Sequence, residues 1–402
     1  MFTMTNYCVY MHNYPFINNK GHMHLCCKNN HYQMPGNIQT HTLKEMYFSK
    51  EYELVRQQML EEIALDGCDI CYSQESRNED SFRIRALNKV KGQRNGTVPY
   101  ETTEIRNLDL RVGSTCNLMC SMCHPTDSSK WAARYESFAR EVTNMSDKHI
   151  EMVMRTNKPN LLDWANHDQS WENIFCSIDK KLNHVYIAGG EPLYIKKFPE
   201  YLSTLLDKAP DAKVSINTNG TRNIDEKYIN RFKDVKLRVS IDGFEGSEEY
   251  QRAGTDWKEK VAVMDQYYKQ MNLEVFDITL TSLTIRTLPA LINFLEERYP
   301  GTTFLLRPVV NREGQRITNV PTHLLTETIE WLEKKVALTK ENRDAYWRYN
   351  NISQILHILK QGYKDEKQTF KRLVTYWDKT ATNTLDSFDP KLAEWVHADS
   401  SS

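Results

Sequence analysis

The sequence has few of the features that mark an exported, membrane-spanning or nucleic-acid-binding protein. Its 402 residues contain no apolar run approaching the length of a membrane span, and the first residues lack the charged-then-apolar pattern of an export signal. The 52 basic and 53 acidic residues nearly cancel, and no basic block is evident, so a nucleic-acid partner has no electrostatic support. We therefore expect a cytoplasmic protein whose partners include neither a membrane nor a nucleic acid.

Cysteine is scarce as well, with nine residues in the whole chain. A sparse and odd number argues against the dense, paired cysteines of small disulfide-stabilised domains. All but one fall into two groups, between residues 8 and 71 and between residues 116 and 123, whereas Cys176 stands alone. We expect Cys176 to be an inert buried thiol, and the two groups to bind metal.

The second group has an unusual spacing. Cys116, Cys120 and Cys123 are arranged C-x3-C-x2-C in one short loop, directly after the apolar segment Leu108–Val112. Three thiolates can ligate three irons of an iron–sulfur cube, and the fourth iron then keeps an open coordination site for a substrate or cofactor. A structural zinc site would require a fourth ligand, and His124 follows too closely to complete the usual geometry. The triplet therefore predicts an open cluster and an enzyme.

From residue 108 onward, strand-like segments alternate with segments that carry apolar residues at helical spacing. The expected strands are Leu108–Val112, Val185–Ala188, Val214–Asn217, Leu237–Ile241, Val275–Leu280 and Phe304–Val310. Helices are expected after the second, third and fifth of them, over residues 198–206, 224–232 and 288–295. This alternation predicts a parallel α/β architecture, either an incomplete barrel or an open sheet.

Four consecutive strands are followed by polar or glycine-containing loops. These loops are the cysteine loop, Gly189–Pro192, Asn217–Thr221 and Ser240–Gly243. Because barrels and open α/β sheets build their sites at the carboxyl ends of parallel strands, the four loops predict one common site. Asn and Asp at strand ends are also ordinary turn residues, which weakens the indication from the last two loops.

The N-terminal cysteines are Cys8, Cys26, Cys27, Cys68 and Cys71. The last two have the C-x2-C spacing of metal ligands, and the glycine before them gives the turn freedom to wrap a metal site. A helix expected over residues 43–62 would separate the cysteines in sequence and let them meet in space. A redox-active pair would require a thioredoxin-like βαβ context, which is absent here. A four-thiolate site is favoured, with iron–sulfur ahead of zinc.

The remaining segments predict helices and a linker. Three tryptophans of the long insertion between the first two strands, Trp131, Trp164 and Trp171, are expected in the core. Apolar stripes beyond about Pro321 predict an all-helical tail. A chain of this length suggests two or three units. We expect an iron–sulfur domain at residues 1–90, a polar linker at 91–104, an α/β core at 105–315 with a helical insertion at 124–183, and a helical C-terminal extension at 316–402.

These motifs resemble a known family. Cys116, Cys120 and Cys123 match the signature of the radical S-adenosylmethionine (SAM) superfamily, and Gly189–Pro192 matches its GGEP motif. Six strand–helix units are similar to its partial (β/α)6 barrel. Met122 departs from the pattern, because many relatives have an aromatic residue there. The resemblance implies an α/β fold: a partial (β/α)6 radical SAM barrel with an N-terminal domain and a helical C-terminal extension.

The N-terminal region resembles the iron–sulfur twitch, or SPASM-like, domain found in part of this family. Cysteines 8, 26, 68 and 71 occur in the order of that pattern, with Gly21 five residues before the second of them. Ser81 and Arg83 follow as they often do in it. The run Tyr250–Trp257 also resembles members that carry this domain, and the likeness covers most of residues 1–310.

The resemblance also implies an activity. Cys116, Cys120 and Cys123 would ligate a [4Fe–4S] cluster whose fourth iron binds the amine and carboxylate of SAM. Reduction, by a donor such as flavodoxin or ferredoxin, would cleave SAM to methionine and a 5′-deoxyadenosyl radical, which abstracts hydrogen from a peptide, protein or small-molecule substrate. The SAM contacts it implies are Gly189, Gly190, Glu191 and Pro192 at the methionine part, and Asn217, Ser240 and Asp242 at the ribose, with Asn219 as the alternative to Asn217.

For the N-terminal domain, the resemblance implies an auxiliary [4Fe–4S] cluster ligated by four thiolates. Its expected ligands are Cys8, Cys26, Cys68 and Cys71, and the glycine spacing favours Cys26 over Cys27. Four ligands would leave this cluster without an open site, which suggests electron relay rather than substrate binding.

Two other classes of function explain part of the sequence. A non-catalytic iron–sulfur carrier or scaffold accounts for the cysteines but leaves Gly189–Pro192 and Ser240–Gly243 without a role. A zinc-stapled binding protein accounts for the N-terminal cysteines but not for the triplet.

Overall fold

The computed structural model describes residues 7–29, 31–77, 80–93, 104–226, 235–270, 273–310, 312 and 314–398. The chain divides into two compact units, each built from separate stretches of sequence. The first comprises Met1–Thr115, Asn160–Ile216 and Ile224–Val235, and the second comprises Cys116–Pro159, Asn217–Asn223 and Lys236–Ser402.

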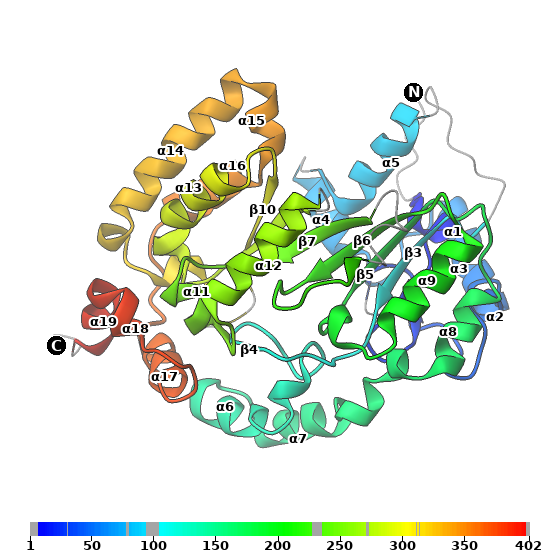
Figure 1. Ribbon diagram of the computed structural model, residues 1–402, viewed down its shortest axis with the longest axis horizontal. Helices are drawn as coiled ribbons and strands as arrows, with labels where there is room; N and C mark the ends of the chain where they lie inside the picture. The colour runs from blue at the N-terminus through cyan, green and yellow to red at the C-terminus, as the bar shows by residue number, and fades with distance from the viewer. Residues whose placement is uncertain are drawn as a thin grey trace. The chain divides into compact units, whose positions relative to one another are not determined.

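The first unit contains a mostly parallel sheet with the strand order β6-β5-β3-β1-β2. Its strands are β1 (Phe16–Ile17), β2 (Met23–His24), β3 (Asn107–Arg111), β5 (His184–Ala188) and β6 (Lys213–Thr218). Strands β3, β5 and β6 lie side by side in parallel (Figure 1). An antiparallel hairpin of β1 and β2 pairs with β3 through β1, so the N-terminal segment extends this sheet.

The helices of the first unit come from both ends of its sequence. They are α1 (Tyr10–Asn13), α2 (Leu43–Tyr47), α3 (Lys50–Leu60), α4 (Asp69–Ser76), α5 (Phe82–Gln93), α8 (Asp168–Phe175) and α9 (Phe198–Lys208), with short 3-10 helices at Pro159–Leu161, Trp164–Asn166 and Pro192–Tyr194. Helices α8 and α9 pack together, and the ring of Trp171 stacks on Tyr201 at a centroid distance of 4.6 Å. Trp164 and Trp171 are buried, as expected for core residues.

In the second unit, β7 (Val235–Ser240), β9 (Leu273–Leu280), β10 (Thr303–Pro308) and β11 (Tyr349–Asn350) are parallel neighbours in that order. Alternate residues of these strands are apolar and fully buried, which is the pattern of a sheet face covered by helices. They include Leu237, Val239, Phe276, Ile278, Phe304 and Leu306. The opposite face is polar: Asp277 pairs with Arg238 at 2.9 Å and with Arg307 at 3.1 Å.

Two further strands, β4 (Met119–Cys120) and β8 (Arg252–Ala253), form a separate antiparallel pair. The helices of this unit are α6 (Tyr135–Val142), α7 (Asp147–Thr156), α11 (Gly246–Gln251), α12 (Trp257–Lys269), α13 (Leu288–Arg298), α14 (Thr326–Glu341), α15 (Arg343–Arg348), α16 (Ile352–Lys360), α17 (Lys367–Trp377), α18 (Leu385–Phe388) and α19 (Pro390–His397). Short 3-10 helices lie at Ser129–Trp131, Ile285–Thr287, Ile317–Asn319 and Thr322–Leu324.

Local sequence explains where two of these helices begin. Asp256 caps α12, because its side chain accepts the backbone N–H of Glu259 at 2.9 Å. Pro289 lies in the first turn of α13, where a missing N–H leaves no hydrogen bond unmade. Helix α6 packs on α17, and the buried Trp131 stacks on Trp377 with ring centroids 5.6 Å apart.

The six expected strands are confirmed as β3, β5, β6, β7, β9 and β10, each beginning and ending within two residues of the expected bounds. The helices expected at residues 198–206 and 288–295 are α9 and α13. Most of the expected helix at 224–232 and most of the expected linker at 91–104 lie outside the described residues.

Three expectations are wrong. The helix expected over residues 43–62 is two helices, because Ser49 caps α3 by accepting the N–H of Tyr52. The tail is not all-helical, since β11 adds a strand at the edge beside β10. Cys176 is exposed rather than buried, because it follows the last turn of α8 at the surface.

Within the described part of the chain, no helix combines the length and the apolar character needed to cross a lipid bilayer.

Candidate functional site

The cysteine loop is fixed in place by the second unit. Cys120 lies on β4, opposite Arg252 of β8, and the next residue, Ser121, donates its N–H to the carbonyl of Gln251 at 2.8 Å. Trp131 donates its indole N–H to the carbonyl of Cys120 at 3.0 Å. Because these bonds hold the loop backbone before any ligand arrives, its thiols are pre-positioned.

The three thiols differ in exposure and neighbours. Cys120 is buried, whereas Cys116 and Cys123 are half-buried. The backbone N–H of Leu118 donates to Cys116 Sγ at 3.5 Å, and Arg252 Nη1 donates to Cys120 Sγ at 3.7 Å. A hydrogen bond from Cys123, assisted by the positive charge of Arg252, lowers the pKa of Cys120. N–H donors and a cation around the sulfurs are the surroundings that a thiolate ligand requires.

This donor set fits an iron–sulfur cluster better than a single metal ion. Among the described residues, no group of three or more Cys, His, Asp or Glu side chains converges as ligands of one ion would. In a four-iron cluster each thiolate binds a different iron, so the sulfurs need not converge on one point. Three thiols in one pre-formed loop satisfy that requirement.

The loop after β5 is built for close backbone contact in the first unit. Gly189 and Gly190 have φ values of +90° and +49°, a region that favours glycine. A Cβ added to Gly190 would lie 2.4 Å from the carbonyl oxygen of Thr115, while the next residue, Glu191, donates its N–H to that same oxygen at 2.7 Å. The second glycine therefore lets the loop lie directly on the backbone that precedes the cysteines.

The side chain of Glu191 is buried and caps the short helix Pro192–Tyr194 by accepting the N–H of Leu193 at 3.1 Å. Pro192 occupies the first position of that helix and is itself buried. The GGEP segment is thus a rigid turn, with one carboxylate oxygen of Glu191 used in the cap.

We predict that Gly190→Ala abolishes SAM binding and costs at least about 2 kcal/mol of folding stability, because the added Cβ meets backbone atoms at a left-handed position. Thermal unfolding and equilibrium dialysis with labelled SAM measure the two effects. Gly301→Ala is the matched control, since Gly301 has a φ of +89° but nothing within 4 Å of an added Cβ. Equal SAM binding by both variants would contradict the role given to Gly190.

Two of the three expected ribose contacts come together, and the third is engaged elsewhere. Asn217 Nδ2 donates to Ser240 Oγ at 3.2 Å, while Asn217 Oδ1 is buried without a hydrogen-bond partner. A buried acceptor without a donor is costly, so a ligand hydroxyl would satisfy it. Asp242 is fully buried, and its carboxylate lies 2.7 Å from Arg252 Nε. That ion pair occupies the carboxylate that we expected at the ribose.

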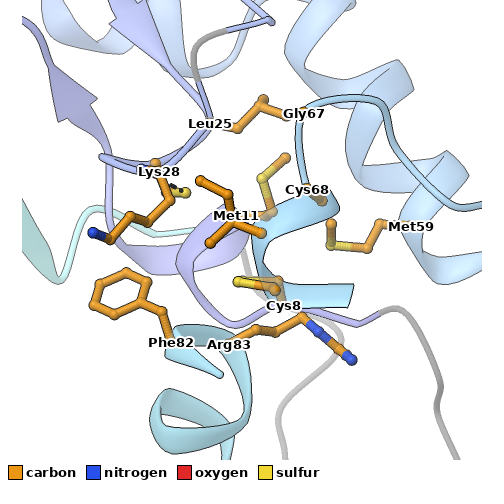
Figure 2. A pocket seen from close by; sticks show the side chains of 12 residues that line it. Cys8, Met11, Leu25, Lys28, Met59, Gly67, Cys68, Phe82 and Arg83 are labelled. Carbon is orange, nitrogen blue, oxygen red and sulfur yellow. Dashed lines mark hydrogen bonds between the residues drawn. The ribbon is translucent and has the colours of Figure 1, made fainter. Parts of the chain in front are cut away.

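Four of the five N-terminal cysteines line one pocket in the first unit. Cys8, Cys26, Cys68 and Cys71 all line it, with a wall that is otherwise largely apolar. Figure 2 shows Cys8 and Cys68 around this pocket together with Met11 and Met59. The other lining residues are Leu25, Lys28, Gly67, Ile70, Phe82 and Arg83.

Backbone and side-chain donors reach these sulfurs too. The N–H of Lys28 donates to Cys26 Sγ at 3.4 Å, and Asn29 Nδ2 donates to Cys68 Sγ at 3.6 Å. Burial raises the pKa of Cys8 and of Cys68, and raises the pKa of Cys26 to about 12. A metal centre would reverse this shift by binding the thiolates, so four thiols around one apolar pocket fit a fully ligated cluster.

Cys27 is not among the pocket residues. Burial raises its pKa, and the nearby carboxylate of Asp109 acts in the same direction, whereas Arg111 opposes it. Both charged residues lie on β3.

Sequence reasoning missed residues that contact the sulfurs. Asn29 and Arg252 were not identified as candidates, although Arg252 lies in the run Tyr250–Trp257 that resembles family members. Asn29 carries no signal in a single sequence, because its approach to Cys68 depends on the fold.

Ser81 and Arg83 both bind the carboxylate of Glu75, which ties the start of α5 to α4.

Comparison with known families gives a match for each of the two segments that contain a cysteine group. Residues 110–295 match the radical SAM superfamily, and residues 8–72 match an iron–sulfur cluster-binding domain of the SPASM type. With the parallel strands and helices described above, these matches confirm the expected α/β fold class, a partial (β/α)6 barrel with an N-terminal iron–sulfur domain.

Two curated relatives are both named GTP 3′,8-cyclase. The chain is 25% identical to the Vibrio atlanticus protein over 199 residues, which cover 48% of this chain and 51% of the relative. It is 24% identical to the Nautilia profundicola protein over 135 residues, covering 34% and 33%. The chain thus matches about half or less of the length of these relatives.

Solved structures give a weak likeness. The structure of anSMEcpe with bound AdoMet and a peptide is 18% identical, with a TM-score of 0.37 and coverage of 59% of this chain and 61% of that one. Streptococcus suis SuiB bound to S-adenosylmethionine is 12% identical, with a TM-score of 0.35 and coverage of 73% and 60%. Likeness at these TM-scores is too small to support an argument.

Proposed function

Because this chain belongs to the radical SAM superfamily and carries a SPASM-type iron–sulfur domain, we propose that it is an enzyme that cleaves SAM reductively and abstracts hydrogen from a substrate. Its cofactors are a [4Fe–4S] cluster, SAM and an auxiliary iron–sulfur cluster. The observation that carries the proposal is the pre-formed loop of Cys116, Cys120 and Cys123, in which N–H donors reach the sulfurs of Cys116 and Cys120.

The protein residues bind and orient the cofactors. Cys116, Cys120 and Cys123 would ligate the first cluster, which together with SAM supplies the radical chemistry when bound. Gly189 and Gly190 would let the backbone approach the methionine part of SAM, because neither residue has a Cβ. The GGEP turn keeps this approach rigid.

Further contacts to SAM would come from the strand ends. Asn217 and Ser240 would bind the ribose, and the unpartnered Oδ1 of Asn217 supports this. Glu191 would offer its carboxylate near the amino group. Asp242 is not included, because Arg252 already occupies its carboxylate.

The second cluster would be ligated by Cys8, Cys26, Cys68 and Cys71, the four thiols that line one pocket. Four protein ligands leave no open iron, so we assign this cluster to electron relay. The electrons would come from a donor such as flavodoxin or ferredoxin. We also propose the domain limits expected from the sequence, with the iron–sulfur domain at residues 1–90, the core at 105–315 and the extension at 316–402.

We propose a peptide or protein as the substrate, on the basis of the SPASM-type domain, which many peptide-modifying members of the family carry. The polar face of β7, β9 and β10, with the charged groups of Arg238, Asp277 and Arg307, supports a polar substrate. GTP is the alternative to include in a substrate screen, because the curated relatives are named GTP 3′,8-cyclase.

The test is anaerobic reconstitution followed by iron and sulfide analysis and an assay for 5′-deoxyadenosine. We expect about eight irons per chain, since two four-iron clusters are proposed. Dithionite and SAM together should yield 5′-deoxyadenosine, and omission of either should give none.

Two other outcomes would overturn the proposal. Full iron content without SAM cleavage would indicate an iron–sulfur carrier or scaffold. Zinc in place of iron would indicate a zinc-stapled binding protein.

A further inference from the structure

Four charged side chains are buried together beside the cysteine loop, all within the second unit. Asp242, Glu248 and Lys260 are fully buried, and Arg252 is 7% exposed. We refer to these four residues as the buried charge cluster. Charged side chains are rarely buried without partners, because removal from water is costly, so each contact in the cluster needs an explanation.

The first pair in the buried charge cluster is Lys260 with Glu248. Lys260 Nζ lies 2.6 Å from Glu248 Oε1, and it also donates to the carbonyl of Ser240 at 2.7 Å. The other oxygen of Glu248 accepts the backbone N–H groups of Asp242 and Gly243, at 2.7 and 3.0 Å. This pair fixes the loop after β7, and Arg252 Nε lies 3.6 Å from Glu248 Oε1.

The second pair, Asp242 with Arg252, also contacts a residue outside the buried charge cluster. Asp242 Oδ2 lies 2.7 Å from Arg252 Nε, and Asp242 Oδ1 accepts the N–H of Thr279 at 2.6 Å. The carboxylate thus anchors one edge of the guanidinium. The Nη1 group of Arg252 donates instead to Cys120 Sγ at 3.7 Å. The contact between Arg252 and Cys120 is not needed to neutralise the buried charge cluster, because its two carboxylates already balance its two cations.

The backbone also holds Arg252 against the cysteine. Cys120 and Arg252 are directly paired across the β4–β8 ladder, and the neighbouring residues Met119 and Ala253 form the second pair. Gln315 Nε2 donates to the carbonyl of Ser121 at 2.9 Å, which fixes the loop on its far side. The guanidinium and the sulfur are therefore held together by main-chain geometry and not only by a flexible side chain.

A cation at this position would affect the reduction potential of an iron–sulfur cluster bound through Cys120. Reduction adds negative charge to the cluster and its thiolates, and the potentials of such clusters depend on net charge and on hydrogen bonds to the sulfurs. Since Arg252 and Cys120 are both buried, solvent screens their interaction only weakly. The guanidinium therefore favours the reduced state over the oxidised state.

We propose that Arg252 is a positioning residue that raises the reduction potential of the cluster on the cysteine loop, and that Asp242 orients it and partly offsets its charge. This inference rests on the proposed function and deepens it. It gives the run Tyr250–Trp257 a physical role, namely to carry a cation to the most buried cluster ligand.

The experiment is a potentiometric titration of the full-length, anaerobically reconstituted protein, followed by electron paramagnetic resonance. The cluster on the cysteine loop is identified as the one whose signal changes when SAM is added. We expect Arg252→Met to shift its midpoint to more negative potential, because a positive charge and a donor to Cys120 Sγ are lost. Arg252→Lys, which keeps the charge, should shift it less.

Asp242→Asn tests the proposal with a midpoint shift of the opposite sign, and the side chain keeps nearly the same shape. Removing this negative charge should move the midpoint to less negative potential, whereas general damage to the loop would move both variants in the same direction. Arg286→Met is the control for loss of an ion-paired arginine, since Arg286 is half-buried and pairs with Asp389 rather than with a residue of the buried charge cluster. Its midpoint should equal that of the wild type.

The outcomes separate this inference from the proposed function. If wild-type protein shows no SAM-sensitive cluster, the proposed function itself fails. If that cluster is present but Asp242→Asn leaves its midpoint unchanged or makes it more negative, only the role of Arg252 and Asp242 is wrong. Should Arg252→Met fail to fold, the Asp242→Asn result still decides the matter.

Discussion

Cys120→Ala is expected to reduce 5′-deoxyadenosine formation to the level measured without reductant. Cys120 is the most buried thiol of the loop and the one that Arg252 contacts, so its loss removes a ligand from the interior of the site. Two thiolates hold a four-iron cluster poorly, and about half of the iron should therefore be lost. Iron analysis and an assay of SAM cleavage measure the two effects on the same reconstituted sample.

The matched control is Cys176→Ala, because Cys176 is an exposed thiol outside both cysteine groups. It should retain full iron content and full SAM cleavage. Loss of folding is checked by thermal unfolding, since removing one buried sulfur costs only about 1 kcal/mol. If Cys120→Ala protein still cleaved SAM at the wild-type rate, the assignment of the radical-generating cluster would be wrong.

Cys68→Ala is expected to remove about half of the iron while the cluster on the cysteine loop remains. Cys68 lines the N-terminal pocket together with Cys8, Cys26 and Cys71, and Asn29 donates to its sulfur. The remaining iron should keep an electron paramagnetic resonance signal that responds to SAM. An unchanged iron content would rule out the auxiliary cluster at this pocket.

The adjacent cysteines provide a sharper comparison in the same domain. Cys26 lines the pocket and Cys27 does not, although the two thiols are neighbours in sequence. Cys26→Ala should therefore lose the auxiliary cluster, and Cys27→Ala should keep it. Loss of iron in Cys27→Ala but not in Cys26→Ala would show that Cys27, and not Cys26, is the ligand.

The sequence was sufficient to predict the main strands, and the reason is local. Each strand of the barrel alternates or concentrates apolar residues over a short span, as in His184–Ala188 and Val235–Ser240, and four of the strands are followed by polar or glycine-containing loops. The cysteine spacing and the GGEP segment predict chemistry because ligand geometry limits the spacing of residues in a single loop.

Other features depend on contacts between residues that are distant in sequence. Strand β11 forms beside β10 because an edge strand was available, and nothing in the tail distinguishes Tyr349–Asn350 from a helical turn. The break between α2 and α3 depends on whether Ser49 acts as a cap or continues the helix, and a single sequence allows both.

By itself, the sequence determined the chemical types and their order along the chain: three thiols after the first strand, glycines after the second, and four more candidate thiols near the N-terminus. Only the tertiary structure decided which polar groups are already engaged. Asp242 pairs with Arg252, whereas Asn217, which donates to Ser240, has a buried side-chain oxygen without a hydrogen-bond partner. The physical reason is that a buried charge or hydrogen-bonding group takes whichever partner the fold brings within reach, and sequence spacing does not encode that distance.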